Sequence, residues 1–204
     1  AMAVGDKGVV ARFVDSHSVT LEILDTWRTT SDAFARSWED RFITEEGYIK
    51  AVSQATAELL KKTKLTVKDI TKVILSASDP RRHRDAARLL GFAPQQVQDP
   101  LFGTLGSTGC ANACALLVAA LEEAKAGDKL LVINYGDGAD AVLFEVTPQI
   151  EKMKHGRGLK GYLGSKKLLP SYDNYLSWRG LLEPDSGVRR PPPPGPSAAA
   201  LHRA

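Results

Sequence analysis

The chain has 204 residues, of which 43% are hydrophobic and 25% are charged, and its formal net charge is +3. These values are typical of one soluble globular domain with a hydrophobic core, and the small net charge does not indicate nucleic-acid binding. No apolar run reaches the roughly 18 residues of a membrane span, and the N-terminus lacks a basic-then-apolar signal pattern. The two cysteines, Cys110 and Cys114, do not make a disulfide framework, and no histidine has a partner at metal-ligand spacing. We therefore expect a cytoplasmic domain with reduced thiols, no membrane association and no metal site.

The N-terminal part is predicted to contain two short strands followed by an amphipathic segment. Residues 1–4 and 9–14 are β-prone and are separated by the turn-forming residues 5–8. Residues 23–42 are aromatic and charged. Their aromatic spacing predicts one helical face packed on the core, made of Trp27, Phe34, Trp38 and Phe42.

An alternation of helices and a buried strand follows. Residues 45–62 have the apolar periodicity of a helix, with Thr44 as its N-cap and Gly47 as a weak position. Residues 72–77 (KVILSA) are typical of a strand buried on both faces, and residues 81–90 predict a short helix closed by Gly91. This order indicates an α/β layered fold.

Residues 99–146 carry the most information. A Gly-rich loop leads into residues 108–125, where Ala and Cys occupy positions that are charged in ordinary surface helices. A helix that is apolar all round is buried in a larger protein, so both cysteines are predicted to be structural core thiols. Cys110 is the better candidate nucleophile of the two because it lies in the first helical turn. The helix is followed by a turn, a buried strand, a GDG loop and a second strand.

The C-terminal part changes in composition. Residues 151–167 are basic and Gly-rich, which fits either a solvated loop or a lid over a phosphorylated ligand. Residues 171–182 predict a final helix, and residues 183–204 form a Pro-rich linker and tail.

The Gly-rich loop, the small-residue helix and the two strands joined by Gly136-Asp137-Gly138 together resemble the C-terminal half of the thiolase superfamily. The closest resemblance is to 3-hydroxy-3-methylglutaryl-CoA (HMG-CoA) synthase-like proteins and initiating ketoacyl-ACP synthases. It covers residues 1–182 and implies an α/β fold: a mixed sheet with a buried central helix, as in the C-terminal half of a thiolase-like layered fold. The family's nucleophilic cysteine belongs to the N-terminal half. The resemblance therefore implies a fragment or a subunit that acts with an N-terminal half or second subunit, as a homo- or hetero-oligomer.

The resemblance also places the catalytic positions of the family on this sequence. The strand-end motif H-x-P-N matches residues 76–79 (SASD), so Ser76 stands for the histidine and Asp79 for the asparagine. The G-N-T turn matches residues 106–108, so Ser107 replaces the asparagine of that turn and Gly106 precedes it. A serine hydroxyl can donate a hydrogen bond to an oxyanion, but it is a poor base at neutral pH. His83 is the candidate substitute for the missing imidazole. Its neighbouring arginines predict that it lies at an exposed helix start.

The implied substrate is an acyl-CoA thioester, with no other cofactor. Gly106, Gly136 and Gly138 are expected to bind substrate at the pocket. For Gly136 and Gly138 the reason is that the corresponding loop of the relatives approaches the reactive cysteine. Arg157 and Lys160 are expected to contact the CoA phosphates if the basic segment closes as a lid. In some relatives a Pro-rich linker leads to an OB-fold and zinc-ribbon module, which implies a possible companion of that kind.

Two functions remain open at this point. The first is one half of a condensing or acyl-transferring enzyme. The second is a non-catalytic scaffold subunit that completes the fold and docks a partner, which would explain the loss of both the histidine and the asparagine.

Overall fold

The computed structural model describes residues 3–153 and 157–182. The chain divides into two compact units, Ala1–Ser165 and Lys166–Ala204. In the second unit the described residues include one helix, α6 (Tyr172–Trp178), within the range predicted for the final helix. The Pro-rich tail, residues 183–204, lies outside the described residues, and the domain boundary at residue 182 stays a prediction.

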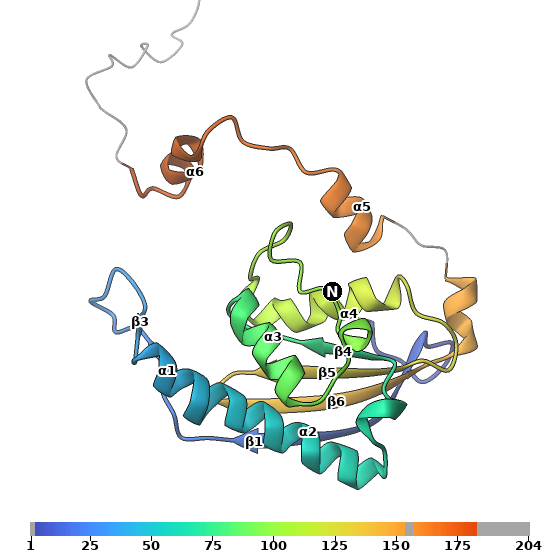
Figure 1. Cartoon of the computed structure of the whole chain (residues 1–204). Coiled ribbons are helices and arrows are strands. Elements are labelled where there is room, and N and C mark those ends of the chain that lie inside the picture. The colour runs from blue at the N-terminus through green and yellow to red at the C-terminus, as the bar shows by residue number, and fades with distance from the viewer. Residues whose placement is uncertain (1–2, 154–156, 183–204) are drawn as a thin grey trace, which may run out of the picture. The chain divides into compact units, whose positions relative to one another are not determined.

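The first unit is built on a mixed four-stranded sheet (Figure 1). The strand order is β1-β6-β5-β4, with bounds Ala11–Thr20 for β1, Gly138–Val146 for β6, Lys129–Tyr135 for β5 and Lys72–Leu75 for β4. Strands β4 and β5 are parallel, whereas β6 runs antiparallel to both β5 and β1. The predicted α/β fold with a mixed sheet is confirmed.

Helices cover both faces of this sheet (Figure 1). Side chains alternate between faces along β5, so Leu131 and Ile133 pack in a cluster with α2 (Lys50–Thr63) and α3 (Pro80–Leu89). Leu130 and Val132 point to the other face and pack in a cluster with α4 (Asn112–Leu121). Continuous burial of β4 and β5 follows from this layering, as their apolar sequence predicts.

The aromatic segment at 23–42 does not form the predicted helical face. Strands β2 (Thr26–Trp27) and β3 (Arg36–Ser37) pair as a hairpin, and the Trp27 and Trp38 rings contact each other with centroids 5.5 Å apart. Phe34 and Phe42 are exposed. The spacing was misleading because cross-strand pairing brings Trp27 and Trp38 together as effectively as a helical turn would.

The first long helix begins earlier than predicted. Glu39 is the N-cap, accepting hydrogen bonds from two backbone N–H groups, so the predicted cap at Thr44 is wrong. Helix α1 (Asp40–Phe42) continues through a π-helical segment, η1 (Ile43–Ile49), into α2. Gly47 lies in this wider segment, where a Cβ would meet the Tyr135 hydroxyl at 2.7 Å. The glycine therefore has a packing reason rather than being only a weak point of the helix.

The N-terminal strand prediction is partly wrong. The predicted strand at residues 9–14 is the longer β1, and residues 3 and 4 are not in a strand. Residues 1 and 2 lie outside the described residues.

The predicted central helix is shorter and less buried than its composition suggested. It consists of a 3-10 turn, η4 (Gly109–Ala111), and α4. The sheet covers only one side of α4, which leaves Cys110, Cys114 and Val118 exposed along the other. The prediction that both thiols are buried in the core is therefore wrong for this chain by itself.

Short helical segments complete the first unit. Three 3-10 segments, η2 (Val67–Asp69), η3 (Pro94–Gln96) and η5 (Pro148–Lys152), connect the main elements. Helix α5 (Gly158–Gly164) contacts α4: the backbone N–H of Lys160 donates to Glu122, and the Lys160 ammonium pairs with Glu123 at 2.8 Å. None of the described helices is long and apolar enough to cross a membrane.

Candidate functional site

A cleft of about 730 Å³ opens in the first unit where the ends of β4 and β5 meet the start of α4 and the β2–β3 hairpin. Both serines predicted from the family's motifs, Ser76 and Ser107, line it. They come from segments about thirty residues apart in the sequence. The fold thus brings together the two positions that the sequence matched to catalytic residues.

Ser76 is held by four hydrogen bonds at the end of β4, one of them from its backbone N–H to the Ile133 carbonyl oxygen at 3.0 Å. Its hydroxyl donates to the Asn134 Oδ1 atom at 2.9 Å and accepts from the Tyr135 backbone N–H at 3.2 Å. Its backbone carbonyl accepts from the Tyr48 hydroxyl at 2.9 Å. This hydroxyl proton is therefore engaged, and Ser76 connects the ends of β4 and β5.

Ser107 has a different environment. It is exposed in the loop that precedes η4, and it faces the same cleft. Gly106, next to it, has φ +77° and open space around it, so it makes the turn and does not line the cleft. Ser107 is thus the more accessible of the two predicted serines.

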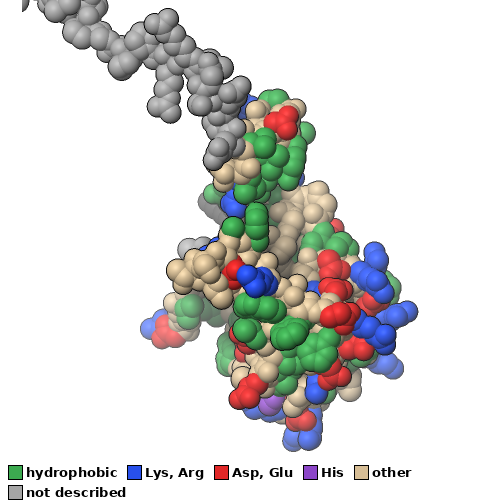
Figure 2. All heavy atoms as spheres, turned by 90° about the vertical axis from the view of Figure 1, so that its left-hand side faces the viewer, with side chains coloured by type: hydrophobic (Ala, Val, Ile, Leu, Met, Phe, Trp, Pro, Cys, Tyr) green, Lys and Arg blue, Asp and Glu red, His purple; other side chains and the backbone are tan. Residues whose placement is uncertain are grey.

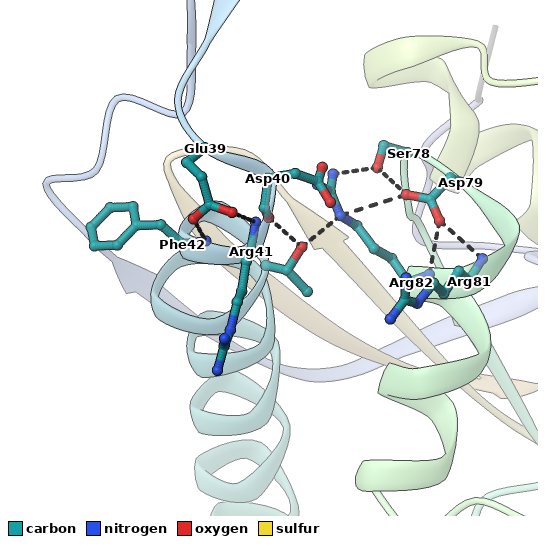
Figure 3. Close-up of polar contacts among 9 residues, drawn as sticks. Glu39, Asp40, Arg41, Phe42, Ser78, Asp79, Arg81 and Arg82 are labelled. Carbon is teal, nitrogen blue, oxygen red and sulfur yellow. Dashed lines mark hydrogen bonds and ion pairs between the residues drawn. The ribbon is translucent and has the colours of Figure 1, made fainter.

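A polar network joins the start of α1 to the start of α3 (Figure 3). The Arg82 side chain is 16% exposed; it donates to Thr44 at 2.9 Å and to Ser78 at 2.6 Å, and it pairs with Asp40. Asp79 is the N-cap of α3 and lies 3.5 Å from the Arg82 guanidinium. Burial opposes ionisation of Asp79, but hydrogen bonds from the Arg82 backbone N–H and the Ser78 hydroxyl outweigh it and lower its pKa. Asp79, matched to the family's asparagine, therefore supports helix α3.

Two tyrosines form the inner wall of the cleft. The Tyr48 and Tyr135 rings meet edge to face with centroids 5.3 Å apart. Burial raises the pKa of both hydroxyls, and the Asp25 carboxylate beside Tyr135 adds to the rise there. Both phenols are therefore neutral hydrogen-bond donors at physiological pH.

His83 does not belong to the cleft. It lies on α3, is 3% exposed and has its ring edge-on to Phe102, and it is not among the residues lining the cleft. The expectation of an exposed helix start is wrong at this residue, because His83 points inward while the arginines beside it, Arg81 and Arg84, point outward. Among the described residues the cleft lining contains carboxylates and arginines but no imidazole.

The burial of His83 predicts a pH dependence of stability. Desolvation lowers its pKa, against a smaller opposite effect of Asp99. The unfolded chain takes up this proton near pH 6.5, whereas the folded chain does so only at lower pH. The free energy of unfolding should therefore fall as the pH drops below about 6.5 and stay level above it with respect to this group.

Urea unfolding across that pH range tests this expectation. His83→Gln should show a weaker loss of stability in acid than the wild type. Equal acid dependence in His83→Gln and wild type would contradict it.

The predicted binding glycines separate into two roles. Gly136 lines the cleft in the β5–β6 turn, with open space around it. Gly138 does not line the cleft: its φ is +133°, and a Cβ there would lie 2.0 Å from the Val19 carbonyl oxygen of β1. Gly138 therefore allows β6 to approach β1.

The two basic residues predicted for CoA binding lie at α5. Lys160 pairs with Glu123, and the Arg157 guanidinium lies 4.7 Å from the centroid of the Tyr162 ring. Neither lines the cleft. Part of the basic segment, residues 154–156, lies outside the described residues, so the lid stays a prediction.

Sequence reasoning missed several polar residues of the cleft. Asn134 and Tyr135 end β5, Asp25 precedes the hairpin, and Asn112 begins α4. Asn112 is 3% exposed, and its amide nitrogen has no hydrogen-bond partner in the described part of the chain. A polar residue within the apolar run NACALLVAAL was the available signal.

No group of three or more metal-ligating side chains occurs among the described residues.

The α/β fold with its mixed sheet matches about half of the chain in solved structures of the thiolase fold. A structure of HMG-CoA synthase complexed with CoA aligns with a TM-score of 0.66 and 17% identity, over 81% of this chain and 46% of that one. The 3-oxoacyl-[acyl-carrier-protein] synthase III of Aquifex aeolicus aligns with a TM-score of 0.59 and 18% identity, over 69% and 46% of the two chains.

Curated sequences point to the same group. The hydroxymethylglutaryl-CoA synthase of Methanopyrus kandleri is 28% identical over 186 residues, which is 90% of this chain and 53% of that protein. That of Methanothermobacter thermautotrophicus is 28% identical over 89% of this chain and 53% of its own length. No protein-family model matches the chain. The chain is a relative of the thiolase superfamily, similar to HMG-CoA synthases and 3-oxoacyl-ACP synthase III, and it spans about half the length of the curated relatives it matches.

Proposed function

We propose that this chain is the C-terminal half of an acyl-CoA-processing enzyme of the condensing type, working with an N-terminal half or partner chain that supplies the nucleophilic cysteine. The observation that carries the proposal is the meeting of Ser76 and Ser107 at one cleft. Their positions match the catalytic positions of the family's motifs. Similarity to HMG-CoA synthases over about half their length supports the substrate class.

Condensation of a thioester needs a nucleophile, an acid/base and donors for an oxyanion. This chain offers donors. The Ser107 hydroxyl is accessible from the cleft, and Asn134 lines it with an amide whose oxygen is held by Ser76. In this proposal Ser76 positions Asn134 and connects the ends of β4 and β5.

A scaffold role is the second candidate, and a specific observation favours it. The Ser76 hydroxyl is fully engaged, and His83 is buried outside the cleft. With no imidazole lining the described cleft, the chain does not offer there the histidine that the family's strand-end motif carries. In this alternative the chain completes the fold and docks a partner. An OB-fold and zinc-ribbon protein is one candidate for that partner.

A double variant, Ser76→Ala with Ser107→Ala, separates the two candidates in the complex purified with its native partner. A direct role predicts a fall in kcat/KM of about a hundredfold, or about 2.7 kcal/mol, as expected for loss of an oxyanion donor. Unchanged turnover would support the scaffold. Each single variant shows which serine is responsible: we expect the loss in rate from Ser107→Ala and a loss of stability from Ser76→Ala.

A further inference from the structure

The two free cysteines differ in their relation to the cleft. Both are exposed; Cys110 lies in η4 and Cys114 lies four residues later in the first turn of α4. Cys110 lines the cleft, whereas Cys114 does not. A molecule bound in the cleft would therefore touch one thiol and leave the other unaffected.

Asn112 gives the second, independent observation. Asn112 is among the residues that line the same cleft, and its amide nitrogen is buried without a hydrogen-bond partner among the described residues. An unpaired buried donor is costly, and a ligand that brings an acceptor would relieve the cost. A carbonyl oxygen is such an acceptor.

We propose that Cys110 is a second acyl-accepting site, which takes the acyl group of a thioester while Asn112 donates to its carbonyl oxygen. The Cys110 sulfur forms a bond to the carbonyl carbon, and the bond from that carbon to the CoA sulfur breaks. The thiol proton of Cys110 ends on the CoA sulfur, so the exchange needs no oxidant or reductant. The step rests on the proposed function only in taking acyl-CoA as the ligand.

Acetyl-CoA is the probe, applied to the full chain. Mass spectrometry of the intact chain should show one added acetyl group, removable by hydroxylamine, and peptide mapping should place it on Cys110. Cys110→Ser should abolish the addition and Cys114→Ser, the matched control, should retain it. Asn112→Asp should slow it by about a hundredfold, because it replaces a donor by an acceptor.

Protection of the wild-type chain gives a measurement that does not depend on variants. Unacylated CoA should slow alkylation of Cys110 by iodoacetamide and leave Cys114 unchanged. Protection of Cys110 without acetyl transfer would overturn the acyl-accepting site while leaving the cleft as a CoA site. Absence of both protection and transfer would overturn this inference and also count against the proposed substrate class. Equal acetylation of the two cysteines would show non-specific chemistry and would overturn it as well.

Discussion

Gly138→Ala is expected to destabilise the chain by about 3 kcal/mol or more, because it combines a strained backbone with a steric overlap. The backbone of Gly138 has φ +133°, and the added Cβ would lie 2.0 Å from the Val19 carbonyl oxygen. The Val19 oxygen is a backbone atom of β1, and the Cβ would be fixed to the backbone of β6, so neither can move without disturbing the β1–β6 ladder. Urea unfolding of both proteins at one pH measures the difference.

Gly136→Ala is the matched control. It lies two residues away in the same turn, has open space around it and lines the cleft. We expect its stability to stay within about 1 kcal/mol of the wild type. A Gly138→Ala variant as stable as Gly136→Ala would contradict the close approach of β6 to β1.

The second prediction is that the chain associates, with itself or with a partner, through the uncovered side of α4. Cys114 and Val118 lie one turn apart on the side of α4 that the sheet does not cover, beyond Cys110 and the cleft, and Val118 is 43% exposed. An apolar stripe on a helix is usually covered. We expect the purified chain to be oligomeric at micromolar concentration unless its partner is bound.

Val118→Lys should weaken that association by at least about tenfold, because a charge would be buried without a partner. Leu89→Lys is the control, since Leu89 is 62% exposed on α3 and lies off this stripe. Light scattering over a concentration series measures the change. A monodisperse wild-type monomer at micromolar concentration would refute the expectation, and equal effects of the two lysines would place the contact elsewhere.

Much of the fold could be predicted because its signals are local. The run KLLVINY is apolar without alternation, as a strand covered on both faces requires, and Asp79-Pro80 marks the start of α3 as cap and first residue. The hairpin at residues 26–37 could not be predicted from the sequence. The contact between Trp27 and Trp38 depends on a chain reversal, which the spacing of the aromatic residues does not show.

The candidate site was predicted in part. Motif order located Ser76 and Ser107, and the structure places both at one cleft. The inward orientation of His83 was missed, since three neighbouring arginines make its helix look solvated. The role of Gly138 was missed for a related reason: a glycine in a loop motif does not show which strand lies against it.

The sequence by itself determined the order of the elements, the apolar layers and the two serines, because periodicity, caps and motif spacing are written in consecutive residues. Only the tertiary structure decided which polar groups are free to act. The Ser76 hydroxyl is engaged because β5 brings Asn134 and Tyr135 to it, and Cys110 is accessible because the sheet covers only one side of α4. Such contacts join residues far apart in the chain, and their geometry follows from how the layers pack.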